Sequence, residues 1–150
     1  MGLKAKDIMS RQLITVGPST KVKELAEILV SNRISGAPVV DDKGSLVGVV
    51  SQSDLVAMHK LPHVPKSVTL FDWVIYLEGA GRLEHELEKM SGVDVDDIMT
   101  RKPETVAPGA SLESIATLMS EKGVHTIPVL DGDRLVGVVG KLDIVRSLLG

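Results

Sequence analysis

The feature that most constrains the fold of this chain is an internal repeat. The sequence Asp-Ile-Met at residues 7–9 returns at residues 97–99, an offset of 97 − 7 = 90 residues. Further along, Leu-Val-Gly-Val-Val at residues 46–50 returns at residues 135–139, an offset of 135 − 46 = 89 residues. The offset changes because the second copy is one residue shorter between these two motifs. Such a repeat predicts two similar folding units that pack on each other.

The first half of each copy has the pattern of a strand followed by a helix. In the first copy, Leu-Ile-Thr-Val at residues 13–16 predicts a short strand, which a Gly-Pro pair ends. Ser19 or Thr20 then supplies a helix cap. Apolar residues at helical spacing follow, with charged residues between them, and predict a helix that ends near residue 33.

The second half of each copy has the pattern of a hairpin followed by a helix. Two apolar runs, residues 37–40 and 46–50, flank the turn-forming sequence Asp-Asp-Lys-Gly, and a helix is predicted at residues 52–58. A single unit with the order βαββα leaves one face of its sheet uncovered. We therefore expect an α+β fold in which two βαββα units pack about a pseudo-two-fold axis.

Composition limits both the kind of core and the kind of partner. The 150 residues are 43% hydrophobic but only 2% aromatic, which predicts an aliphatic core. The net charge of −3 provides no general attraction to nucleic acid or anionic lipid. The sequence has no cysteine, and no apolar run reaches the roughly 18 residues that a membrane-spanning helix needs. We therefore expect a cytoplasmic protein with neither nucleic acid nor membrane as a partner.

Residues 60–94 lie between the two copies and contain every aromatic residue of the chain, Phe71, Trp73 and Tyr76. Within this insertion, apolar residues at helical spacing among glutamates at residues 83–90 predict a short amphipathic helix. Two interpretations remain open. The insertion either covers the core of the repeat or forms a contact surface for a second copy or another protein.

Together, the repeated motifs resemble a pair of CBS domains, a regulatory module also called a Bateman module. The resemblance rests on Asp-Ile-Met-Ser and Asp-Ile-Met-Thr at the start of the copies, and on Gly-Ala-Pro-Val-Val-Asp and Thr-Ile-Pro-Val-Leu-Asp at the second strand. Gly-Val-Val-Ser-x-Ser-Asp after the third strand of the first copy completes the set. The chain then divides into a first CBS unit at residues 1–59, the insertion at residues 60–94 and a second CBS unit at residues 95–150.

The resemblance implies a module that senses a ligand and does not catalyse a reaction. Many CBS pairs bind an adenosine-containing ligand, such as AMP, ADP, ATP or S-adenosylmethionine, in clefts between the units, and many form homodimers. Such a module needs no catalytic cofactor and no metal ion, and it signals to a separate effector protein, here of unknown identity. The sequence agrees, since it contains no evident Ser–His–Asp arrangement, Gly-rich phosphate loop or set of spaced metal ligands.

The first predicted cleft lies at the strand ends of the first copy. The resemblance places Asp54 at the ribose of a nucleotide, while Ser51, Ser53 and the start of the following helix offer donors to phosphate. Serine and aspartate also cap helices, so Ser51 and Asp54 have a structural alternative. The predicted residues of this cleft are Ile14, Ile34, Ser35, Gly36, Ala37, Pro38, Ser51, Ser53 and Asp54.

The second predicted cleft lacks both serine hydroxyls, because Gly140 and Leu142 stand at the equivalent positions. Lys141 and His125 instead add basic groups that bind phosphate by charge, and Asp143 keeps the ribose position. We therefore expect two similar clefts that treat phosphate differently. Two outcomes stay open for the second cleft, which binds either a more highly charged ligand or none. The predicted residues of the second cleft are Glu104, Val124, His125, Thr126, Ile127, Pro128, Lys141 and Asp143.

An alternative function remains open beside ligand sensing. The chain would then be a ligand-free scaffold for dimerisation or for binding another protein, with residues 60–94 as its contact surface. A Trp73 that is exposed in the free protein and protected in a complex would favour this scaffold, whereas a Trp73 buried in the monomer would oppose it.

Overall fold

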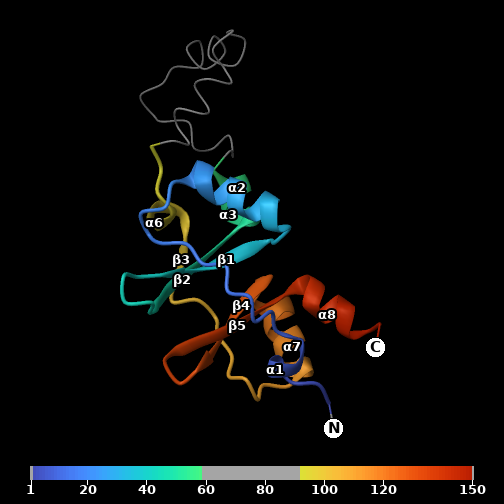
Figure 1. Cartoon of the computed structure of the whole chain (residues 1–150). Coiled ribbons are helices and arrows are strands. Elements are labelled where there is room, and N and C mark those ends of the chain that lie inside the picture. Colours follow the sequence, from blue (N-terminus) through green and yellow to red (C-terminus); the bar gives the residue numbers. More distant parts are fainter. Residues whose placement is uncertain (1, 59–91, 150) are drawn as a thin grey trace, which may run out of the picture.

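The structure, a computed structural model, describes residues 2–58 and 92–149 of the chain. These residues form two β-sheets, each with helices packed against it, in two halves that lie one above the other in Figure 1. The mixed helix and sheet architecture predicted from the repeat is confirmed. The predictions for Phe71, Trp73, Tyr76 and the amphipathic helix fall outside the described residues.

The first copy contains the predicted helix, hairpin and second helix. Helix α2 spans Val22–Asn32, and the hairpin follows as strands β1, Gly36–Val40, and β2, Leu46–Ser51. Helix α3 spans Gln52–Ala57 directly after β2. The predicted cap of α2 differs, because the Thr20 hydroxyl accepts a backbone N–H from the preceding turn and makes no cap hydrogen bond to α2.

The second copy repeats these elements in the same order. Helix α7 spans Leu112–Lys122, strand β4 spans Thr126–Asp131, strand β5 spans Arg134–Gly140 and helix α8 spans Lys141–Ser147. Both hairpins pair antiparallel, and both shift register at the same point of the repeat, near the end of their first strand. The two copies therefore share their backbone structure as well as their sequence motifs, including the register shift in the hairpin.

The first strand predicted in each copy is reduced to a single paired residue. Val16 forms a parallel bridge with β1 and donates its N–H to the Pro38 carbonyl at 3.1 Å. The next bond of a parallel ladder would run from the N–H of residue 38 to the Ile14 carbonyl, but proline has no N–H. The pairing therefore stops, and Val106 and Pro128 repeat the arrangement in the second copy.

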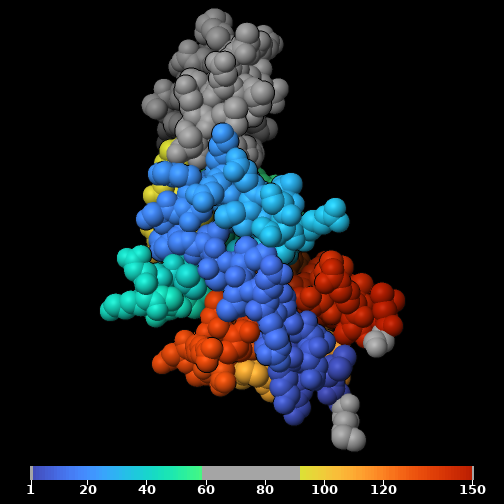
Figure 2. All heavy atoms as spheres, in the orientation of Figure 1, coloured from blue at the N-terminus to red at the C-terminus, as the bar shows by residue number. Residues whose placement is uncertain are grey.

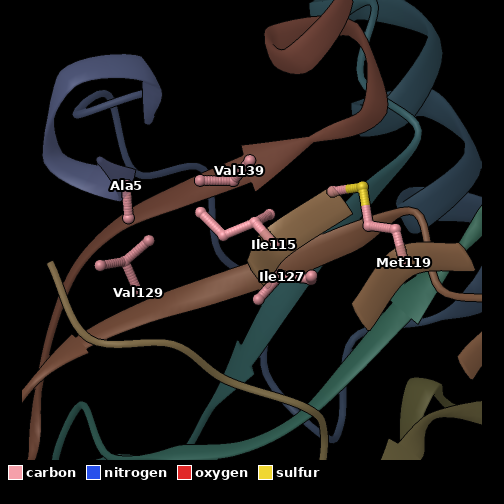
Figure 3. Close-up of a cluster of buried hydrophobic side chains, with 6 residues drawn as sticks. All are labelled: Ala5, Ile115, Met119, Ile127, Val129 and Val139. Atoms are coloured by element: carbon pink, nitrogen blue, oxygen red, sulfur yellow. The ribbon is translucent and has the colours of Figure 1, made fainter. Parts of the chain in front are cut away.

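The opening segment of the first copy packs on the second unit. Helix α1, Ala5–Ile8, buries Ala5 completely in the core that α7, β4 and β5 form. Ser10 then pairs with Val138 of β5 through two backbone hydrogen bonds of 2.8 and 3.1 Å. Figure 3 shows this core, which consists of Ala5, Ile115, Met119, Ile127, Val129 and Val139.

The opening segment of the second copy makes the reciprocal contacts with the first unit. Helix α6, Val95–Ile98, buries Val95 in that core, and strand β3, Thr100–Arg101, pairs antiparallel with β2. This exchange is not predictable from the sequence, because one apolar turn does not indicate which core it joins. The core of the first unit consists of Val16, Leu25, Leu29, Val39, Val50 and Val95.

The exchange explains why both copies contain the same methionine and the same strand glycine. A Cβ at Gly48 of β2 would lie 2.7 Å from the Thr100 carbonyl oxygen and 2.9 Å from the Met99 sulfur. Gly137 of β5 has the same relation to Met9. A side chain at either glycine would therefore push the exchanged segment away from the sheet.

The two units meet where β1 and β4 approach each other. Ser35 Oγ lies 3.4 Å from Thr126 Oγ1, and a Cβ at Gly36 would lie only 2.6 Å from that same Thr126 oxygen. Gly36 and Thr126 are equivalent positions of the repeat, since 126 − 36 = 90. A glycine in one copy therefore makes room for the buried threonine of the other.

Candidate ligand-binding site

A cavity of about 810 Å³ opens between the two units. Its walls come from the segment after α1, the loop between α2 and β1, and the start of α8. Figure 2 shows a notch between the cyan atoms at the end of α2 and the red atoms of α8. The lining residues are Ser10, Gln12, Ile14, Asn32, Arg33, Ile34, Ser35, Gly36, Pro38, Gln52, Thr126, Val138, Gly140, Lys141, Leu142, Asp143, Val145 and Arg146.

One wall of this cavity contains five residues that were predicted for the first cleft. Ile14 and Ile34 are half-buried and make the wall partly apolar, while Ser35 adds a hydroxyl. Gly36 and Pro38 continue the wall along β1. This wall therefore offers a partly apolar surface with a hydroxyl beside it.

The opposite wall comes from the second copy. Thr126, Lys141 and Asp143, all predicted for the second cleft, line the same cavity. Asp143 Oδ2 accepts the Gly140 N–H at 2.7 Å, which caps α8, and Arg146 Nη1 lies 3.8 Å from Asp143 Oδ1. The capping bond holds the carboxylate in place at the cavity and uses only one of its two oxygens.

The structure thus groups the predicted residues differently from the sequence analysis. Ser51, Ser53 and Asp54 of the first copy are not among the described residues that line this cavity. Helix α8 of the second copy lines this cavity, whereas Gln52 is the α3 residue that lines it. The physical reason is the packing of β1 against β4, which places the loop before β1 beside the last helix of the other unit.

Ser51 and Asp54 form the N-terminal cap of α3. Asp54 Oδ2 accepts the Ser51 N–H at 2.8 Å and the Ser51 hydroxyl at 3.3 Å. Burial raises the pKa of Asp54 above its ordinary value, and the two hydrogen bonds from Ser51 oppose that rise. The structural alternative considered for these residues is therefore observed, and the second carboxylate oxygen takes no part in it.

The remaining predicted residues lie outside the cavity lining. Ala37, Ile127 and Pro128 are buried, Val124 is half-buried, and Glu104 and His125 are exposed. The His125 carbonyl accepts the Lys141 N–H at 3.0 Å, just as the Ser35 carbonyl accepts the Gln52 N–H at 2.8 Å. Each loop is therefore tied to the last helix of its own copy.

Several lining residues were not predicted from the sequence, among them Gln12, Arg33 and Arg146. Arg146 lies three residues after Asp143 on α8, so helical spacing would have placed it on the same face. Gln12 follows the exchanged opening segment, and no sequence pattern reveals that exchange. Arg33 ends α2, where the pattern indicated only a helix end.

The chemistry of the cavity follows from these side chains. Its described lining combines an apolar wall and several hydroxyls with one carboxylate and three cationic side chains. Within residues 2–58 and 92–149, no three His, Cys, Asp or Glu side chains are grouped so as to hold a metal ion. No helix of these ranges has the length and apolar character to cross a bilayer.

Comparison with known protein families gives a match for both copies. The CBS domain matches residues 5–60 and residues 95–150. The chloroplastic CBS domain-containing protein CBSX2 of Arabidopsis thaliana is 35% identical over 146 residues, which is 93% of this chain and 60% of the relative. The uncharacterized protein MJ1426 of Methanocaldococcus jannaschii is 28% identical over 96% of this chain and 90% of its own length. The chain spans about 60% of the length of the Arabidopsis relatives CBSX2 and CBSX1.

Two solved structures share the fold over nearly the whole chain. CBSX2 from Arabidopsis thaliana in complex with AMP has a TM-score of 0.71 and 32% identity, and the match covers 99% of this chain and 97% of that one. The CBS domain pair of protein MJ0100 in complex with 5-methylthioadenosine and S-adenosyl-L-methionine has a TM-score of 0.73 and 25% identity, with coverage of 100% and 98%. Both of these neighbours hold adenosine-containing molecules.

Proposed function

The chain belongs to the CBS-domain family, as a tandem pair of CBS domains, and from this membership we propose that it is a non-catalytic regulatory module for an adenosine-containing ligand. The ligand is AMP, ADP, ATP or S-adenosylmethionine, and it binds in the cavity between the two units. The observation that carries the proposal is the composition of that cavity, which faces an apolar wall of the first copy with the Asp143 carboxylate of the second.

The apolar wall suits an adenine base. Ile14 and Ile34 supply the contact surface, and among the described residues no N–H is donated to the Ile14 carbonyl, because Pro38 has none. A backbone carbonyl accepts a hydrogen bond from the exocyclic amino group of adenine. Guanine carries a carbonyl oxygen at the equivalent ring position, so this wall favours adenine over guanine.

The carboxylate of Asp143 suits the ribose. A carboxylate accepts hydrogen bonds from two neighbouring hydroxyls, and a ribose diol provides them. Asp143 Oδ2 already accepts the Gly140 N–H at 2.7 Å, so the side chain is oriented before any ligand arrives. The sugar then lies between the two units, with the base against the first copy.

The pseudo-two-fold relation extends the proposal to a second cleft. Asp54 is the equivalent carboxylate, with Ser51 and Ser53 beside it, and residues from His125 to Pro128 form the facing wall. In this second cleft the serine hydroxyls replace the cationic side chains that surround Asp143.

Ligand binding becomes a signal because the ligand contacts both units. The units touch at Ser35 and Thr126, whose hydroxyl oxygens are 3.4 Å apart. A ligand that binds one spacing of the units more tightly than another shifts the population toward that spacing. The homodimer and the separate effector protein predicted from the resemblance stay predictions.

Isothermal titration calorimetry of the purified chain with AMP, ADP, ATP and S-adenosylmethionine tests the proposal. We expect saturable binding of at least one of the four, with circular dichroism as the control that the chain is folded. Mass spectrometry of any nucleotide released from the purified protein by heating provides an independent identification. A folded protein that binds none of the four and releases no adenosine compound would contradict the proposed function.

A further inference from the structure

Arg33 has an unusual backbone conformation for an arginine. It ends α2 with φ 54° and ψ 46°, in the left-handed region that glycine adopts most readily. The equivalent position of the second copy, 33 + 90 = 123, is Gly123, with φ 64° and ψ 29°. The same turn therefore ends both helices, and only the first copy places a large charged side chain there. Residues held in such a sparsely populated backbone region are typical of functional sites.

Lys141 is the counterpart of Arg33 on the other side of the cavity. It is the first residue of α8, next to the capping bond between Gly140 and Asp143. The equivalent residue of the first copy, 141 − 89 = 52, is Gln52, which is uncharged. Each of the two cations, Arg33 and Lys141, therefore has an uncharged residue at the equivalent position of the other copy.

The charges around the cavity are unbalanced. Its described lining contains Arg33, Lys141 and Arg146 as cations and Asp143 as the one carboxylate. Arg146 lies 3.8 Å from that carboxylate, so this pair is close to neutral. Arg33 and Lys141 are both exposed at the cavity, and no ion pair of either residue is present among the described side chains. The described lining of the cavity therefore has a net positive charge.

We propose that Arg33 and Lys141 form a cationic clamp that holds the phosphate chain of an adenosine polyphosphate, such as ADP or ATP. The inference rests on the proposed function, because the adenosine lies against Ile14 and Asp143 and the clamp acts on the phosphates beyond it. The two cations come from different copies, so a polyphosphate also links the two units. The guanidinium of Arg33 binds two phosphate oxygens at once, and the Lys141 ammonium acts as a point charge.

The clamp selects ligands by charge. ATP and ADP carry several negative charges, AMP carries fewer, and adenosine carries none. S-Adenosylmethionine carries a positive sulfonium group, which two unpaired cations repel. We therefore expect affinity in the order ATP, ADP, AMP and adenosine, with S-adenosylmethionine weaker than ATP. We also expect the preference for ATP to fall as salt concentration rises.

Two substitutions that copy the other repeat test the clamp. Arg33→Gly introduces the residue found at Gly123, which suits the left-handed backbone and keeps the fold. Lys141→Gln introduces the residue found at Gln52. By calorimetry, we expect each variant to bind ATP about tenfold more weakly and adenosine within about twofold of the wild type. Lys43→Gly removes the same charge from the exposed β1–β2 turn and should leave ATP binding unchanged.

The outcomes separate the clamp from the proposed function. If wild-type protein binds adenosine as tightly as ATP, or if both variants keep wild-type affinity for ATP, the clamp is wrong while the nucleoside site stands. If inorganic tripolyphosphate binds and is lost in Arg33→Gly while adenosine does not bind, the clamp stands and the adenosine site is wrong. If the folded chain binds neither ATP nor tripolyphosphate, the clamp is overturned.

Discussion

The N-termini of α3 and α8 share one backbone arrangement and differ in the chemistry around it. In both, an aspartate in the first turn accepts the N–H of the capping residue, Asp54 at 2.8 Å and Asp143 at 2.7 Å. The residues beside it are Ser-Gln-Ser at 51–53 in one copy and Gly-Lys-Leu at 140–142 in the other. The hydrogen bond needs only the aspartate, so its neighbours can differ in charge and polarity without loss of the helix start. This is how one fold provides two sites of different character.

At the helix starts the two copies are free to differ, whereas at the contact between the units they have to differ. Gly36 and Thr126 occupy equivalent positions and face each other across the pseudo-two-fold axis. A second threonine at position 36 would overlap the first. An exact duplication of the unit would therefore not pack as this pair does, and divergence at this contact is part of the fold.

The largest expected effect comes from making that contact symmetric with Gly36→Thr. The new Cβ would lie 2.6 Å from Thr126 Oγ1 and 3.0 Å from the Val50 carbonyl oxygen. We expect the free energy of unfolding in urea to fall by about 3 kcal/mol, as for other overpacked sites. Thr126→Gly in the same chain should restore part of the loss.

Gly109→Thr is the matched control for this change. A Cβ at Gly109 has no atom within 4 Å, so its unfolding free energy should change by less than about 0.5 kcal/mol. Equal losses in both variants would mean that threonine itself, rather than the contact between units, causes the effect.

The exchange of opening segments predicts the next largest effect. Val95→Ala removes two methyl groups from a fully buried position in the core of the first unit, and should lower the free energy of unfolding by about 2 kcal/mol. Because Val95 packs with Leu25 and Leu29 of α2, hydrogen exchange should accelerate more in α2 than in α7. Greater loss of protection in α7 would show that the segment packs on its own copy. Val56→Ala, at a side chain that is 69% exposed, is the control.

The two aspartates allow a direct comparison of the two clefts. Asp143→Asn keeps an oxygen to accept the Gly140 N–H but loses the negative charge and an acceptor for the ribose. We expect ATP to bind about tenfold more weakly at the cavity lined by Lys141, close to 1.4 kcal/mol. Asp54→Asn should leave this binding event unchanged and weaken only a second one, which calorimetry detects as a separate step. If Asp54→Asn weakened ATP binding at the cavity lined by Lys141 and Asp143→Asn did not, the pairing of Asp143 with Ile14 in one site would be contradicted.

The smallest expected effect concerns the pH dependence of Asp54. Its pKa is raised in the folded protein because burial disfavours the carboxylate. The folded state therefore holds the proton more tightly than the unfolded state, and stability falls as pH rises from the unfolded pKa through the folded one. Relative to Asp54→Asn, which does not titrate, the wild type should lose stability across this acidic window. A gain with rising pH would show that the hydrogen bonds from Ser51 outweigh burial.

The sequence by itself determined the local elements of this protein and their duplication. Helical spacing predicted α2, and short apolar runs on both sides of a turn predicted the hairpins, because these signals depend on neighbours within a few residues. Pro38 and Asp143 were selected from the sequence motifs, and both line the cavity. The strand predicted at residues 13–16 was too long, since only Val16 pairs with β1. The cause, the missing N–H of Pro38, is visible in the sequence.

Only the tertiary structure decided which segments complete which core and which walls form the cavity. Ala5 joins the second unit although it stands at the start of the first copy, and Val95 joins the first unit although it stands at the start of the second copy. The cavity likewise combines Ile14 of one copy with Asp143 of the other, because β1 packs against β4. Burial of apolar surface is favourable whichever segment of the chain supplies the complementary surface. The apolar pattern of one copy therefore cannot specify which unit its opening segment packs against. The function proposed for this protein depends on that pairing.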